Sequence, residues 1–103
     1  MPVRGERQAF ARAIVAEAPD APGVYALFEN DDLIFYGSAF GGTITLRSCL
    51  GEHLFGLRAA AARSATHCAW EISLSPAARE RELLEEFQER FGRRPRLNGK
   101  AGA

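Results

Sequence analysis

The clearest pattern of hydrophobic and polar positions lies in residues 21–39, where two short apolar runs flank a polar tetrapeptide. The first run, residues 24–28, follows a Pro-Gly pair, and the second, residues 33–36, ends at Gly37. Both runs are rich in aromatic and β-branched residues, which favour strands. The polar residues 29–32 are typical of a turn, because Asn and Asp hydrogen-bond their own backbone and tolerate a positive φ. The pattern predicts a β-hairpin.

Four further elements are predicted from the remaining pattern. Apolar residues recur at helical spacing in residues 6–18, 44–57 and 76–91, which predicts three amphipathic helices. The last of these has a proline in its first turn and Gly92 after its end, as helix boundaries favour. Residues 66–74 alternate between apolar and polar side chains and predict a third strand.

Length and composition narrow the class of protein. A chain of 103 residues supports one core, so we expect a single domain over residues 1–103. Its 13 basic and 13 acidic residues give a net charge of zero. The protein as a whole therefore does not attract nucleic acid or a membrane electrostatically, although a local cluster of charges can. Cys49 and Cys68 lack zinc-site spacing, which favours reduced thiols. With neither a signal-peptide pattern nor a bilayer-length apolar run, we expect a cytoplasmic protein with no membrane partner.

Two tripeptides of the hairpin carry a resemblance to a known family. Gly-Val-Tyr at residues 23–25 and Phe-Tyr-Gly at residues 35–37 resemble the paired signature of the GIY-YIG nuclease superfamily. Glu-x-x-Leu-Leu at residues 80–84 and Pro-x-x-Asn at residues 95–98 are similar to later motifs of that family.

The resemblance spans residues 21–98 and leaves residues 1–20 as an N-terminal helical extension. The fold that it implies is a small α/β (α+β) domain with a three-stranded, mostly antiparallel sheet flanked by helices. The activity that it implies is hydrolysis of DNA phosphodiester bonds with one divalent metal ion, Mg²⁺ or Mn²⁺.

The resemblance also implies roles for individual residues. Tyr25 would position or deprotonate the attacking water, and Glu80 would hold the metal ion, with Glu82 as the competing candidate. One carboxylate with retained waters suits magnesium, and the metal would polarise the phosphate and stabilise the leaving oxygen.

Two positions depart from the family pattern. Phe35 stands where the second tyrosine is expected, so either Tyr36 is re-aimed by a bulge or the hydroxyl is missing from the site. Cys49 stands where the catalytic arginine is expected, four residues before His53. Arg47 is two residues away, about 200° around a helix. Tyr36 and His53 are therefore auxiliary catalytic candidates, and Arg47 is a candidate phosphate clamp.

The end of the chain is locally basic. Four cations, Arg93, Arg94, Arg96 and Lys100, form a cluster that can contact phosphates without base specificity. Asn98, the last residue of the Pro-x-x-Asn motif, would bond back near the site. A solvated terminus is the alternative interpretation of the same charges.

Three functions follow from these patterns. The first is a metal-dependent endonuclease that acts on DNA. The second is a catalytically degenerate module that binds nucleic acid or protein, because each lost transition-state contact costs about 10²–10³ in rate. The third is a nucleophilic thiol at Cys49 activated by His53, since residues four apart share one helix face.

Overall fold

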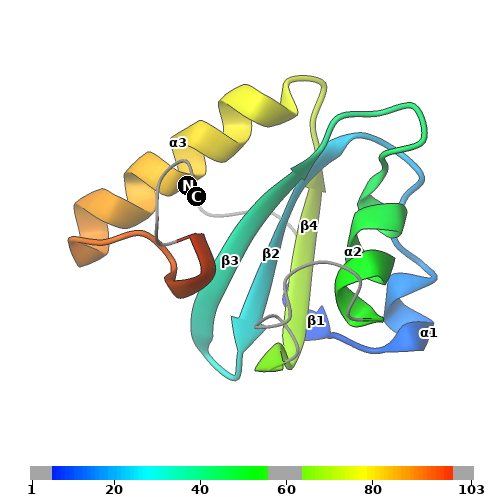
Figure 1. Cartoon of the computed structure of the whole chain (residues 1–103), viewed down its shortest axis with the longest axis horizontal. Coiled ribbons are helices and arrows are strands. Elements are labelled where there is room, and N and C mark those ends of the chain that lie inside the picture. The colour runs from blue at the N-terminus through cyan, green and yellow to red at the C-terminus, as the bar shows by residue number, and fades with distance from the viewer. Residues whose placement is uncertain (1–5, 56–63, 99–103) are drawn as a thin grey trace.

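A four-stranded antiparallel sheet with the order β1-β4-β2-β3 forms the centre of the structure, a computed structural model that describes residues 6–55 and 64–98. The elements in chain order are β1 (Gln8–Ala9), α1 (Arg12–Val15), β2 (Gly23–Glu29), β3 (Asp32–Ala39), α2 (Leu46–Leu54), β4 (His67–Ile72), α3 (Pro76–Phe91) and the 3₁₀ helix η2 (Arg96–Asn98). Helices α1 and α2 lie on one side of the sheet and α3 lies on the other (Figure 1). The chain is therefore a small α+β domain.

The prediction of three strands and of a helix over residues 6–18 is wrong at the N-terminal end. Gln8 and Ala9 pair with Cys68 and His67 and add a short fourth strand, while the helix is confined to Arg12–Val15. The backbone N–H of Phe10 also donates to the carbonyl of Thr66. An open strand edge presents unpaired backbone groups, and satisfying those of β4 outweighs the helical preference of this short segment.

The predicted hairpin is confirmed. Its strands are β2 and β3, and Asn30 in the turn has a φ of 55°, the left-handed conformation that Asn tolerates. The register shifts between Leu27 and Phe28, so Ile34 is an extra residue on β3. This bulge precedes Phe35 and Tyr36, and the side chains of these two residues still lie on opposite faces of the sheet.

The two faces of the sheet carry separate cores. Tyr25, Leu27 and Phe35 pack toward α1 and α2, on what we call the α2 face. Val24, Ala26 and Tyr36 pack against Leu83 and Phe87 of α3, on what we call the α3 face. Alternation along β2 and β3 thus distributes the residues of the two motifs between two different environments.

The helices begin and end at recognisable signals. Helix α2 begins after Thr45, whose side chain accepts from the backbone N–H of Ser48 in a reciprocal capping box, and it ends at Leu54, short of the predicted limit at residue 57. Helix α3 has the predicted bounds, and Gly92 follows it with a φ of 72°. No helix in the described parts of the chain is long and apolar enough to cross a membrane.

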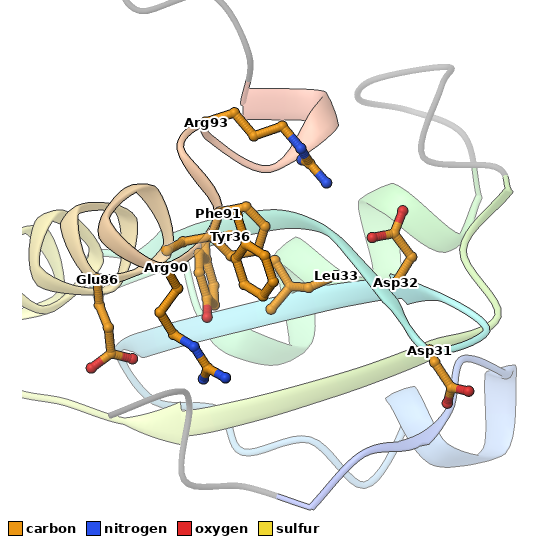
Figure 2. A pocket seen from close by; sticks show the side chains of 9 residues that line it. Asp31, Asp32, Leu33, Tyr36, Glu86, Arg90, Phe91 and Arg93 are labelled. Atoms are coloured by element: carbon orange, nitrogen blue, oxygen red, sulfur yellow. The ribbon is translucent and has the colours of Figure 1, made fainter.

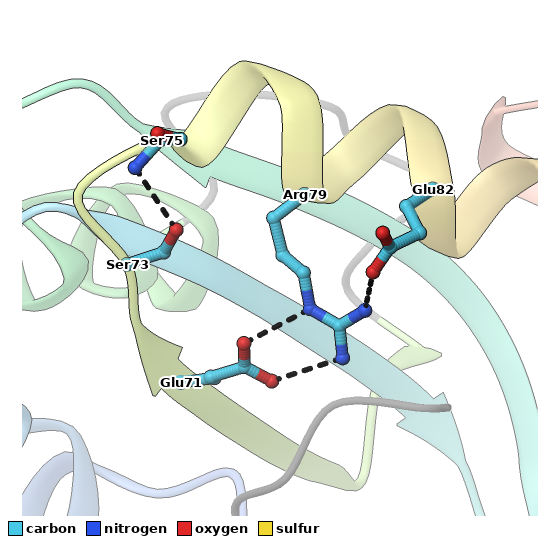
Figure 3. A network of polar contacts seen from close by, with 5 residues as sticks. All are labelled: Glu71, Ser73, Ser75, Arg79 and Glu82. Carbon is cyan, nitrogen blue, oxygen red and sulfur yellow. Dashed lines mark hydrogen bonds and ion pairs between the residues drawn. The ribbon is translucent and has the colours of Figure 1, made fainter.

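One arginine fastens α3 to the sheet. Arg79 donates to both carboxylate oxygens of Glu71 on β4, at 2.9 and 3.2 Å, and also contacts Glu82 one turn further along α3 (Figure 3). The side chains of Arg79 and Glu71 are each only 14% exposed. Bidentate geometry and partial burial make this pair stronger than a surface ion pair, and it fixes the place of α3 over the α3 face.

Candidate functional site

Tyr25 lies at the centre of a buried aromatic group on the α2 face. Its hydroxyl is 2.9 Å from Nε2 of His53 on α2, and the two residues are 1% and 2% exposed. The Phe35 ring lies 5.2 Å from His53 and 6.1 Å from Tyr25, measured between centroids. Phe35 therefore fills the space beside Tyr25 with an apolar ring.

The close approach of Gly37 to Tyr25 explains why a glycine stands at this position of the motif. It pairs with Tyr25 across the hairpin, and a Cβ added at Gly37 would lie 2.4 Å from Cζ and 2.5 Å from the hydroxyl oxygen of Tyr25. Only glycine leaves room for the tyrosine ring there. The glycine thus serves the packing of Tyr25, whether or not the tyrosine takes part in chemistry.

Tyr36 lies on the opposite face from Tyr25. Its ring meets Phe87 edge to face at 6.5 Å, and burial raises the pKa of its hydroxyl against the lowering effects of Arg79 and Arg90. The side chain of Asn98 pairs with the Tyr36 backbone: Oδ1 accepts from its N–H at 2.8 Å and Nδ2 donates to its carbonyl at 3.0 Å. Asn98 thus takes the place of a strand neighbour at the outer edge of β3 and bonds back to the hairpin.

Glu80 also belongs to the α3 face. Its Oε1 accepts a hydrogen bond of 2.7 Å from the hydroxyl of Ser38, whose cross-strand partner, Val24, packs toward α3. The sheet therefore separates Glu80 from Tyr25 and His53, and the structure does not assemble the predicted catalytic set.

Basic side chains share the surroundings of Glu80. A pocket of about 380 Å³ beside it is also lined by Arg81, Arg94 and one further carboxylate, Glu85. The two guanidinium groups balance the two carboxylates of this pocket, and Glu82, the competing ligand, is bound to Arg79. Within residues 6–55 and 64–98, no group of three or more His, Cys, Asp or Glu side chains is placed to hold a metal ion.

The α2 candidates are held in structural contacts. The Nε of the exposed Arg47 donates to the carbonyl of Ala18 at 2.9 Å and so joins α2 to the turn after α1. Cys49 is fully buried in the core on the α2 face of the sheet. A substrate does not reach a thiol in that position, so the burial speaks against the nucleophilic role of Cys49.

The C-terminal arginines do gather at one place. Arg93, Arg94 and Arg96 line a pocket of about 410 Å³ together with Asp32 from the hairpin. Arg96 also forms an ion pair of 2.8 Å with Glu29, and Arg93 lies 5.5 Å above the Phe87 ring. Lys100, the fourth predicted cation, lies outside the described residues.

Sequence reasoning missed a second pocket that adjoins this basic one. It measures about 270 Å³, and its apolar floor is formed by Leu33, Tyr36, Phe87 and Phe91. Charged side chains surround this floor, with Arg90 and Glu86 at one end, Asp31 and Asp32 at the other and Arg93 above (Figure 2). The signal for it was the mixture of aromatic and basic residues in Arg-Phe-Gly-Arg-Arg at positions 90–94.

Comparison with known proteins adds no assignment. Neither the family models nor the curated protein sequences compared with this chain give a match.

Proposed function

We propose that this chain is a GIY-YIG-like domain that has lost catalytic activity and binds nucleic acid by contacting the phosphates of the nucleic acid. The observation that carries the proposal is the separation of Tyr25 from Glu80 by the sheet, with Tyr25 sealed against His53. A residue that positions a water or a phosphate must reach it at hydrogen-bond distance. The Tyr25 residue is 1% exposed and its hydroxyl lies against the buried imidazole of His53, so it has no such access.

The resemblance in sequence order supports a domain of this family. The hairpin with its close-packed glycine is followed by α2, β4 and α3, and Asn98 returns to the hairpin. These features maintain the framework, while Phe35 and Cys49 occupy the positions of two expected polar groups. A domain that keeps the framework of the family but replaces its catalytic groups is better suited to binding nucleic acid than to cleaving it.

Charge segregation supports nucleic acid as the partner. The described arginines at the end of α3 and beyond it are Arg90, Arg93, Arg94 and Arg96. A shallow depression on the preceding turns of α3 is lined by four glutamates and a glutamine, which are Glu82, Glu85, Glu86, Glu89 and Gln88. The net charge is zero, and the described part of the chain gathers these arginines, which attract phosphate, beside an acidic stretch that repels it.

The test is binding and cleavage measured on the same samples. Single-stranded, duplex and branched DNA are incubated with the protein and with Mg²⁺ or Mn²⁺, using wild type, Glu80→Ala and the matched surface control Glu89→Ala. We expect salt-sensitive binding by all three proteins and no cleavage. Metal-dependent nicking that disappears only in Glu80→Ala would instead establish the nuclease, and absence of binding to every DNA would point to a protein partner.

A further inference from the structure

The pocket beside Tyr36 combines an exposed aromatic surface with charges of both signs. Phe91 is 55% exposed, and its ring lies 4.5 Å from that of Phe87 at 40° between the planes. The guanidinium groups of Arg90 and Arg93 lie 5.5 Å from the centroids of Phe91 and Phe87, respectively. Such cation–π pairs hold the rings in place and keep positive charge at their faces. We call this site the aromatic pocket.

The chemistry of the aromatic pocket matches that of a nucleobase and its phosphate. An exposed phenylalanine provides a stacking surface for any base. Carboxylates such as Asp32 accept hydrogen bonds from base amino groups, and guanidinium groups bind phosphate oxygens. Drug-sized ligands occupy cavities of roughly 300–1,000 Å³, so a pocket of about 270 Å³ suits one ring system.

The aromatic pocket adjoins the pocket lined by Arg93, Arg94, Arg96 and Asp32, which we call the basic pocket. Arg93 and Asp32 line both of them. A strand whose phosphates run along Arg94 and Arg96 would therefore bring its next residue to the aromatic pocket. A base held in a duplex is stacked on its neighbours, whereas a single strand can present an unstacked base.

We propose that the aromatic pocket receives one unstacked base of a single-stranded nucleic acid, stacked on Phe91, with the adjoining phosphate on Arg93. This proposal rests on the proposed function and adds to it the class of nucleic acid and the place where a base is held. It predicts that the bases contribute to affinity, in addition to the backbone.

The experiment compares two single-stranded DNA hexamers of identical length, one with bases and one with an abasic sugar at every position. Affinities are measured by fluorescence anisotropy for wild type, Phe91→Ala, Phe91→Tyr and Phe55→Ala. Phe55 is a matched control, because it is 59% exposed at the end of α2 and Arg12 lies 5.6 Å from its ring centroid. The Phe91→Tyr variant keeps a stacking ring at the site.

We expect wild type, Phe91→Tyr and Phe55→Ala to bind the base-containing strand more tightly than the abasic one. Phe91→Ala should bind the base-containing strand about 5- to 150-fold more weakly than wild type does, the usual range for one lost base–aromatic stack, with no change on the abasic strand. If Phe91→Ala binds both strands as wild type does, the base site is refuted while phosphate binding stands. If wild type binds neither strand, the proposed function fails together with the base site.

Discussion

Removing the hydroxyl of Tyr25 should destabilise the protein without changing its affinity for nucleic acid. The Tyr25 hydroxyl and His53 Nε2 are 2.9 Å apart, and both residues are almost fully buried. Tyr25→Phe leaves the imidazole without this bond in a place that excludes water, which costs about 1–3 kcal/mol. For a domain of this size, each kcal/mol lowers Tm by roughly 4–8 °C.

The assay is thermal and urea unfolding followed by circular dichroism, with Tyr36→Phe as the matched control. No hydrogen bond from the Tyr36 hydroxyl occurs among the residues that the structure describes, so its removal should change the free energy of unfolding by less than about 0.5 kcal/mol. A double-mutant cycle with His53→Leu isolates the pair. If Tyr25→Phe unfolds at the temperature of wild type, the interpretation of Tyr25 as a structural residue is wrong.

Three further predictions concern the framework. Gly37→Ala should lower the free energy of unfolding by about 1–3 kcal/mol through overpacking against Tyr25. Gly51→Ala should raise it by about 0.5–1 kcal/mol, because the added Cβ meets no atom within 4 Å in the middle of α2. Urea titration measures both changes, and equal effects of the two substitutions would contradict the prediction. Asn98→Ala should cost about 1–3 kcal/mol, because it removes both bonds to the Tyr36 backbone, and amide exchange at Tyr36 should accelerate; unchanged protection would contradict the strand-neighbour role. Burial raises the pKa of Cys68 from 9.0 to about 11, so the folded state holds this proton more tightly than the unfolded state does. Stability should therefore fall between pH 9 and 11 by about 1.4 kcal/mol per pH unit more in wild type than in Cys68→Ala; parallel pH profiles of the two proteins would refute this.

Local signals predicted the elements that local contacts determine. The turn around Asn30, the alternation of Phe35 and Tyr36 and the end of α3 at Gly92 all follow from conformational preferences of a few adjacent residues. Strand β1 does not, because Gln8 and Ala9 become a strand only by meeting residues about sixty positions later on the edge of β4. An alanine-rich segment carries no sign of such a distant partner.

The candidate site shows the same limit more sharply. Motif order placed Tyr25 and Glu80 in one family pattern, but which face of the sheet α3 covers depends on the whole tertiary arrangement. The bond from Ser38 to Glu80 and the contact of Tyr25 with His53 put the two residues on opposite faces. The basic cluster was easier to predict, because Arg93, Arg94 and Arg96 are neighbours in the chain.

The most direct test of the central claim is the salt dependence of binding to single-stranded DNA. Each phosphate contact of an arginine contributes about 0.7 to the slope of log affinity against log salt. Arg93→Gln and Arg94→Gln should therefore each reduce the slope by about 0.7, and together by about 1.4. Arg12→Gln changes the net charge equally on the other side of the sheet and should leave the slope unchanged. Slopes that are the same for all variants would show that the arginines after α3 do not contact phosphate, and the account would be wrong.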